Sequence, residues 1–386
     1  MSILLKNYKS NEDLKLLRKI IFIWIASRAF MLLMMLVFNI FMETDYSISE
    51  LINKWDAKRY YYIVENGYTF PNDFDPQANW AFFPVYVLAC MAVKFITFGM
   101  LDTYWIGIII SNICVIVSGY YAVKCIGDDK RALLIPCMMM FGPYSFYSAA
   151  MMTEPMFVMF IVLFFWFCKN KKFVWAGVMS ALASGTRIVG CILVFSLIIE
   201  LYRHISPGKI SRAGIKKFIL KMLKTPEYIF AVLICPLGAF CYMTFLGFFC
   251  GDVWAYKNVQ IAWRDEKYFP VVGVLWNACT GQIEPRYTYM GWVCVAVIIV
   301  YAYMFYRKHY SMATFGLVTL LIALSSHVMS TCRFTVGSYV IYVGIYDLII
   351  RCKEKHRWLK WTVFAVAMLV EIWLLLQWYN ESDWLF

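Results

Sequence analysis

The sequence predicts an all-α integral membrane protein, on its composition, the length of its apolar stretches and the placement of its charges. Hydrophobic residues make up 62% of the 386 residues and charged residues only 16%, whereas soluble domains average about 45–50% and about 25%. Apolar stretches of roughly 17–25 residues, enough for a transmembrane helix, recur along the whole chain. We therefore predict one polytopic membrane domain, residues 1–386, that crosses the bilayer about eleven times and has no separate soluble domain.

The positions of the basic residues account for the net charge of +12. Most Lys and Arg lie in short segments beside apolar stretches, which is the positive-inside pattern of membrane proteins. We therefore expect a location in the cell membrane and no nucleic-acid partner. The 13 cysteines are scattered through apolar segments without CxxC or Cys/His spacing, so we expect buried thiols rather than disulfides or metal ligands.

The first crossing is predicted from Ile20 to Phe41. It lacks a small-residue cleavage site, so we expect it to remain as a span. The five bases that precede it predict a cytoplasmic N-terminus. The segment that follows, Met42–Trp80, has seven acids and three bases and is predicted to lie outside.

The stretch Phe82–Gly99 is apolar enough to cross, and so is Tyr104–Cys125. If both crossed, the bases of Lys169–Lys172 and Arg203–Lys224 would lie on the outer side. Because basic segments set the orientation, we predict that Phe82–Gly99 lies along the outer interface or enters the membrane and returns. The first outer loop then covers residues 42–103.

The remaining apolar stretches alternate in direction across the membrane. Phe173–Leu201 has basic segments on both sides, so its 29 residues are predicted to enter and leave as two short helices that meet near Thr186-Arg187. Tyr202–Lys224 is predicted to be a basic cytoplasmic loop, residues 250–288 form a second outer loop, and the C-terminus lies outside. The other predicted spans are Tyr104–Cys125, Ala132–Tyr147, Pro155–Cys168, Tyr228–Phe249, Tyr289–Tyr306, Ser311–Ser330, Phe334–Ile350 and Trp361–Trp378.

This topology gathers several polar groups on the outer face. Charges at membrane depth are costly and usually face a cavity or a partner, so we expect these groups to meet. They are Asp56, Lys58, Arg59, Glu65, Thr153, Glu154, Thr186, Arg187, Asp252, Gln260, Trp263, Arg264, Ser330, Thr331 and Arg333.

Each of these residues also has a purely structural interpretation. Asp56 can cap a helix or pair with the bases that follow it, Lys58 or Arg59. Arg187 and Arg333 can neutralise nearby acids without binding any ligand. The tryptophans of the outer loops are typical of the aromatic belt at a membrane interface. Taken one at a time, none of the residues establishes a function.

Taken together, the residues fit the transfer of a sugar from a lipid phosphate. An inverting transfer needs a carboxylate that takes the proton of the acceptor hydroxyl, and Asp56 is our candidate. It needs a cation on the leaving phosphate, which Arg binds with two parallel hydrogen bonds; Arg187 and Arg333 are the candidates. A chain with 31 Phe and 22 Met can also line a groove for an isoprenoid tail.

Five stretches carry a resemblance to a known family, and all five follow the order of that family. The stretches are W-D-A-K-R-Y-Y-Y-I-V-E-N-G-Y at Trp55–Tyr68, A-F-F-P-V-Y at Ala81–Tyr86, T-E-P-M-F at Thr153–Phe157, T-R-I-V-G at Thr186–Gly190 and G-D-V-W-A-Y-K-N-V-Q-I-A-W at Gly251–Trp263, with a weaker sixth, S-T-C-R-F, at Ser330–Phe334. On these stretches the chain resembles the glycosylphosphatidylinositol mannosyltransferase II family and its bacterial relatives, within the GT-C class of membrane glycosyltransferases.

The resemblance implies a GT-C-type helical bundle, a polyprenyl- or dolichyl-phosphate-linked donor, and transfer of a hexose, mannose in that family, on the outer side. It implies that Asp56 is the catalytic base. The donor-phosphate and substrate-binding residues expected with it are Lys58, Arg59, Glu154, Arg187, Gln260, Trp263 and Arg333.

Two departures from the family pattern concern the substrate contacts. Met152-Thr153 precede Glu154 where the family usually has Tyr-Ser, and Phe334 follows Arg333 where it usually has Tyr. The compact loops are typical of a bacterial member, for which we expect a glycan, glycolipid or protein acceptor in place of a glycosylphosphatidylinositol precursor. The identities of the sugar and the acceptor stay open.

Alternatives remain at this stage. A polytopic transporter or lipid flippase is the main one, although such proteins usually show inverted repeats and mid-membrane broken helices, and we find no repeat. A non-catalytic subunit is another. A divalent cation shared by Asp56 and Glu154 is possible, but we favour pairing of these acids with Arg187 and Lys58.

Overall fold

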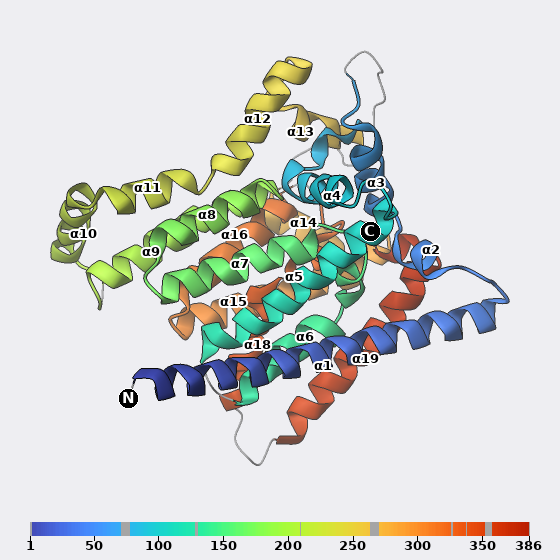
Figure 1. Cartoon of the computed structure of the whole chain (residues 1–386), viewed down its shortest axis with the longest axis horizontal. Helices are drawn as coiled ribbons and strands as arrows, with labels where there is room; N and C mark the ends of the chain where they lie inside the picture. Colours follow the sequence, from blue (N-terminus) through green and yellow to red (C-terminus); the bar gives the residue numbers. More distant parts are fainter. Residues whose placement is uncertain are drawn as a thin grey trace.

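The computed structural model describes residues 2–70, 78–127, 130–208, 210–262, 270–325, 327–336, 338–351 and 357–385. All regular secondary structure within these ranges is helical, which confirms the predicted all-α class. Helices α5 (Thr103–Ile126), α7 (Glu154–Lys169) and α8 (Phe173–Ser184) pack against one another in sequence order and lie lengthwise through the centre of the molecule (Figure 1).

Several helices have the length and composition of membrane spans. Among the described residues, five helices are long and apolar enough to cross a bilayer, or six if a bent pair counts as one span. They are α1 (Ser2–Met42), α5 (Thr103–Ile126), η4 with α9 (Ile188–Ile192 and Leu193–Ile205), α15 (Arg286–Tyr306) and α19 (Arg357–Tyr379), and the bent pair is α11 (Pro226–Ile234) with α12 (Leu237–Cys250). The chain is therefore a helical protein with several membrane crossings.

The other predicted spans form shorter helices. Each has 16 residues or fewer, so the total of about eleven crossings stays a prediction. These helices are α6 (Leu134–Phe141), α7 (Glu154–Lys169), α8 (Phe173–Ser184), α16 (Tyr310–Leu324) and α18 (Tyr339–Arg351), with the short α17 (Thr331–Val336) before the last.

The broken hairpin predicted near Thr186-Arg187 is confirmed. Helix α8 ends at Ser184, and η4 begins at Ile188. Gly190 allows the second half to fold back closely, because a Cβ at that position would lie 2.4 Å from the Ala183 carbonyl carbon. The break leaves Arg187 at the tip of the hairpin, in extended backbone.

The stretch predicted to lie at the outer interface forms α4 (Pro84–Ile96). Its 13 residues extend about 20 Å, which is shorter than the roughly 30 Å hydrocarbon core. Figure 1 shows α4 nearly end-on, whereas α5 lies lengthwise. The crosswise direction of α4 favours an interfacial position.

A polar contact joins α4 and α5 to α3 (Asp56–Asn66). Lys94 of α4 donates to the Glu65 carboxylate at 2.5 Å, and the Thr103 hydroxyl of α5 donates to its other oxygen. These two hydrogen bonds hold the pKa of Glu65 below its usual range. The helix that begins with Asp56 is thereby anchored at its far end.

Helices interrupt both predicted outer loops. The first contains α2 (Ile48–Ile52), α3, η1 (Asn79–Ala81) and α4. The second contains α13 (Ala255–Asn258), η5 (Val259–Ala262) and α14 (Val271–Cys279).

Two predicted segments have internal structure that the sequence analysis did not anticipate. The basic segment Tyr202–Lys224 includes the end of α9, which continues to Ile205, and the amphipathic helix α10 (Arg212–Lys224). The predicted span Tyr228–Phe249 consists of α11 and α12, which meet at 49°. Pro236 lies at this break and lacks the N–H that a continuous helix requires.

The two ends of the helical bundle carry different side chains, and lysines gather at one of them. The Lys169 ammonium at the end of α7 donates to the Lys124 and Cys125 carbonyls at the end of α5, and Lys124 pairs with Asp13 of α1. The first residues of α5 and α7 lie at the other end, near α3, and the 16 residues of α7 separate the two ends by about 24 Å. The side of the membrane that each end faces stays a prediction.

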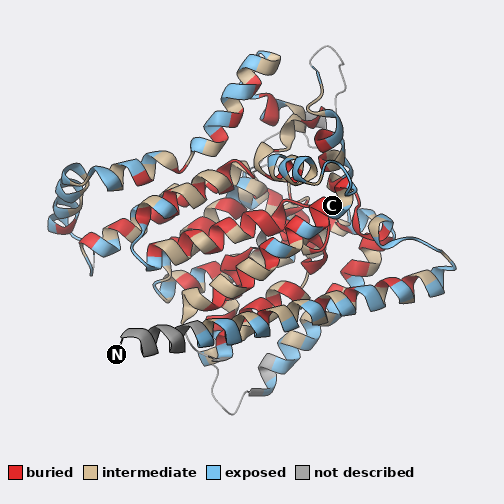
Figure 2. Ribbon diagram, in the orientation of Figure 1, coloured by how far each residue is buried: buried red, intermediate tan, exposed pale blue. Residues whose placement is uncertain are grey.

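The helices at the centre of the bundle are the most deeply buried. Figure 2 shows the buried residues concentrated in α5, α7 and α8, while α1, α12 and α19 expose much of their surface. The exposed side chains of α1 include Phe22, Leu36 and Phe41, which are 72%, 62% and 81% exposed. Exposed apolar side chains at this density are expected where a helix faces lipid.

A glycine at the α8–α12 contact provides a test of this packing. A Cβ at Gly238 would lie 2.0 Å from the Ala181 carbonyl oxygen and 2.6 Å from the Gly185 nitrogen. We expect Gly238→Ala to destabilise the protein by about 1–3 kcal/mol, as overpacking does. Gly273→Ala in α14 is the control, since a Cβ there meets nothing within 4 Å. Thermal unfolding in detergent measures both, and equal midpoints would contradict the α8–α12 contact.

Candidate functional site

Four charged side chains from four separate segments form one connected cluster, which we term the ion cluster: Asp56, Glu154, Arg187 and Arg333. Arg333 Nη2 lies 2.7 Å from Asp56 Oδ2, and Arg333 Nε donates to Glu154 Oε1. Arg187 Nη1 lies 2.8 Å from the same Glu154 oxygen. The structure thus brings together four of the eight site residues predicted from the sequence.

Both carboxylates stand at the start of a helix. Glu154 is the first residue of α7, with Pro155 after it, and Asp56 is the first residue of α3. Helix N-termini favour negative charge, because the first backbone N–H groups have no partner within the helix. A hydrogen bond of 3.2 Å between the Tyr60 and Thr153 hydroxyls joins the two helices beside the cluster.

The backbone directly before Asp56 is strained. Trp55 has φ 44° and ψ −107°, a conformation that non-glycine residues rarely adopt and that costs about 1–3 kcal/mol. The Trp55 ring packs against Trp378 at the end of α19, with centroids 4.8 Å apart, and the Trp378 indole N–H donates to the Ile52 carbonyl. The C-terminal helix therefore stabilises the turn that orients the Asp56 side chain.

Exposure decides from which side the ion cluster is accessible. The side chains of Arg333 and Glu154 are 5% and 10% exposed, and that of Arg187 is 18% exposed. The Asp56 side chain is 32% exposed. Any substrate reaches the cluster at Asp56 and Arg187, whereas Glu154 and Arg333 stay inside the protein.

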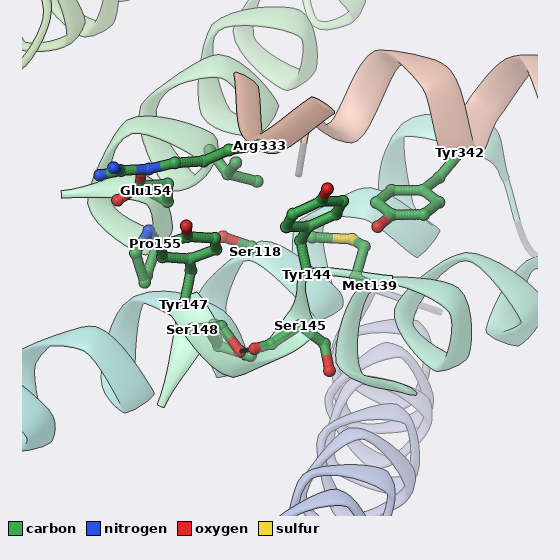
Figure 3. Close-up of a pocket in the computed structure, with 12 residues that line it drawn as sticks. Ser118, Met139, Tyr144, Ser145, Tyr147, Ser148, Glu154, Pro155, Arg333 and Tyr342 are labelled. Carbon is green, nitrogen blue, oxygen red and sulfur yellow. Dashed lines mark hydrogen bonds and ion pairs between the residues drawn. The ribbon is translucent and has the colours of Figure 1, made fainter. Parts of the chain in front are cut away.

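A small pocket lies on the inner side of the cluster (Figure 3). It has a volume of about 40 Å³, and Glu154, Arg333 and Tyr147 are among the residues that line it. The Arg333 guanidinium carbon lies 4.6 Å from the centre of the Tyr147 ring, a cation–π contact that stabilises a buried cation. Such a volume suits about one water molecule, so the pocket is too small for a sugar.

Two polar atoms in this region are buried without a hydrogen-bond partner in the described part of the chain. They are Glu154 Oε2 and the Tyr147 hydroxyl oxygen. Buried polar atoms usually have partners. The pocket therefore has acceptor and donor capacity that the protein itself leaves unused.

The other predicted site residues lie elsewhere or outside the described part. Lys58 is 60% exposed, with its ammonium 3.8 Å from Glu381, and Arg59 is half-buried on α3. The Gln260 amide nitrogen donates to the Tyr256 carbonyl. Trp263 falls outside the described residues.

The expected meeting of the early acid with later arginines is confirmed, whereas the expected pairing with Lys58 is not. Glu154 pairs with Arg187 and Asp56 with Arg333, while the Lys58 ammonium lies 3.8 Å from Glu381. Lys58 follows Asp56 by two positions on α3, and residues two apart do not share a helix face.

Tyr147 and Trp378 were not identified as site residues from the sequence. Tyr147 follows the F-G-P-Y stretch and precedes Glu154 by seven positions, and the sequence there indicates only a short aromatic segment. Trp378 belongs to the last span and is more than 320 residues from Ile52, to which it is bonded. No local sequence pattern predicts either contact.

Asp56 and Glu154 are the residues that could hold a metal ion. Both already bind the Arg333 guanidinium. In the described ranges no group of three or more His, Cys, Asp or Glu side chains is placed to hold an ion. A cation here would require additional oxygen ligands from substrate and water.

Removal of the Glu154 carboxylate, which both arginines share, tests whether the ion cluster stabilises the folded protein. Glu154→Gln leaves two largely buried guanidinium groups without their common partner. Breaking a buried pair from one side costs about 3–5 kcal/mol, so we expect a marked fall in the thermal unfolding midpoint. Glu284→Gln is the control, because that side chain is 61% exposed in its pair with Arg286 and its loss costs about 0–1 kcal/mol. Equal midpoints for the two variants would contradict the buried cluster.

Comparison with known proteins gives no assignment by sequence: no family model matches the chain, and no curated protein matches it. Among solved structures, the chain is similar to the oligosaccharyltransferase of Archaeoglobus fulgidus in its complex with zinc and sulfate, with a TM-score of 0.44 and 13% identity. The match covers 84% of this chain and 48% of the other, so the chain spans about half the length of that neighbour. A likeness at this level assigns neither a family nor an activity.

Proposed function

We propose that the protein is a membrane glycosyltransferase that moves a hexose from a polyprenyl-phosphate-linked donor to an acceptor hydroxyl at the outer face of the membrane, with inversion. One observation carries the proposal: an accessible carboxylate, Asp56, is joined through Arg333 to Glu154 and Arg187. These are the residue types that the reaction needs. The sequence resemblance to glycosylphosphatidylinositol mannosyltransferase II supports the same chemistry.

In the proposed reaction Asp56 is the general base. The acceptor oxygen attacks the anomeric carbon from the side opposite the phosphate, while the bond between that carbon and the phosphate oxygen breaks. The acceptor proton passes to the Asp56 carboxylate, and polyprenyl phosphate leaves. The 32% exposure of the Asp56 side chain lets a hydroxyl reach it, as general base catalysis requires.

Arg187, whose side chain is 18% exposed, binds the leaving phosphate in this proposal. Arginine matches phosphate with two parallel charge-assisted hydrogen bonds. Arg333 stays buried and holds the Asp56 carboxylate in position from inside the protein. Glu154 positions both guanidinium groups and does not touch the substrate, because its side chain is 10% exposed.

The donor and acceptor are proposed at the level of chemical class. Mannose is the sugar that the resemblance implies, and the acceptor is a glycan, glycolipid or protein hydroxyl. The lipid tail of the donor would lie against the apolar helix surfaces beside the cluster, since the 40 Å³ inner pocket has no room for it.

The role of Asp56 is tested by Asp56→Asn. This substitution keeps the shape of the side chain but removes its basicity, so we expect transfer from a polyprenyl-phosphate sugar to fall by about 10²–10⁴-fold. Asp45→Asn, at an exposed acid of the same outer segment, should retain full activity. The measurement is the formation of glycosylated product by the purified proteins in detergent or liposomes.

Two results would contradict this proposal. Full transferase activity of Asp56→Asn would reject Asp56 as the base. Movement of the lipid-linked sugar across liposome membranes by the parent protein, without any covalent product, would favour a transporter or flippase.

The requirement for a metal ion is tested separately. Arg333 already supplies positive charge to both Asp56 and Glu154, so we expect transfer to persist in excess EDTA. Loss of activity in EDTA that Mg²⁺ or Mn²⁺ restores would instead show that the two carboxylates share a divalent cation with the substrate phosphate.

A further inference from the structure

The basic helix α10 carries an unusual concentration of positive charge. Lys217, Lys221 and Lys224 follow one another at spacings of four and three, which places them on one face of the helix, and Lys216 lies beside them. All four side chains are exposed, and no ion pair in the described ranges involves them. Like charges at this spacing repel one another, so the helix is more stable when an anion lies against this face.

The other side of α10 is apolar and only partly covered. Phe218 and Met222 pack against the core, with Phe218 5.7 Å from the Tyr202 ring of α9. Next to them, Ile215, Ile219 and Leu223 are 43%, 51% and 68% exposed. An exposed apolar strip opposite a lysine strip is typical of a helix that lies in the membrane interface.

An open recess lies under the lysine face. Its volume is about 670 Å³, and its walls come from the end of α9, from α10 and from the start of α11. The lining includes polar groups from all three helices: His204, Lys217, Lys221, Lys224 and Tyr228. A volume of this size accommodates a small organic ligand.

The position of α10 argues for lipid rather than a soluble anion. Figure 1 shows α10 nearly end-on at one end of the bundle, where α8 and α9 lie lengthwise. His204 and Tyr228 both pack against Phe173, the first residue of α8, so the recess lies at the end opposite the ion cluster. A helix placed crosswise at the end of a membrane bundle lies at the level of the lipid headgroups.

We propose that the recess between α9, α10 and α11 binds the phosphate headgroup of an anionic phospholipid. The ammonium groups of Lys217, Lys221 and Lys224 hold the phosphate, and the acyl chains lie along Leu220, which lines the same recess and is 46% exposed. The site is independent of the proposed transferase chemistry, since it shares no residue with the ion cluster.

The test uses the full-length protein in neutral detergent, incubated with phosphatidylglycerol and phosphatidylcholine of identical acyl chains. Native mass spectrometry counts the lipids bound. We expect preferential retention of phosphatidylglycerol, and a loss of its affinity of about 10–30-fold in Lys217→Gln/Lys221→Gln, or about fivefold for each lysine. Lys217→Arg/Lys221→Arg keeps the charge and should keep the preference.

The matched control is Lys171→Gln/Lys172→Gln, which removes two exposed lysines from the α7–α8 turn at the same end of the bundle. It should leave the preference intact. If Lys217→Gln/Lys221→Gln does not purify as a monodisperse species, Lys217→Gln/Lys224→Gln replaces it with the same expectation.

Three outcomes would overturn the proposal. They are equal binding of the two lipids by the parent protein, equal losses in the recess and control variants, and displacement of phosphatidylglycerol by millimolar inorganic phosphate. The last would identify a site for free phosphate and not for a lipid.

Discussion

The buried guanidinium of Arg333 is the group on which the rest of the site depends. A cation 5% exposed inside a membrane protein is stable only when it is paired and hydrogen-bonded. Arg333 meets this condition by binding Asp56 and Glu154 and by lying over Tyr147. The starts of α3, α7 and α17 are consequently held together, although they are far apart along the chain.

The last helix completes this arrangement. Trp378 packs against the strained Trp55 and donates to the Ile52 carbonyl, and Glu381 pairs with the largely buried Lys54 at 2.9 Å. A strained backbone persists only where its surroundings hold it. The direction of Asp56 is therefore set by Trp378 at the end of α19 and by Glu381 just after it, in addition to its own helix.

The two ends of the bundle have different electrostatic characters. One end carries a compact, charge-balanced cluster of two acids and two arginines, and the other carries Lys124, Lys169 and the lysines of α10. The same helices, α5 and α7, connect the two ends. The proposed substrate chemistry and the proposed lipid site therefore lie at opposite ends of one helical core.

The sequence by itself determined the helical class, the broken hairpin at Thr186-Arg187 and the residue types of the site, because composition, span length and charge placement are local properties. Only the tertiary structure decided that one guanidinium, that of Arg333, binds both Asp56 and Glu154. It alone showed that Tyr202–Lys224 contains a helix and that Trp378 supports the turn before Asp56. Glu154 and Arg333 are 179 positions apart, and contacts over such separations depend on how helices pack, which no local pattern records.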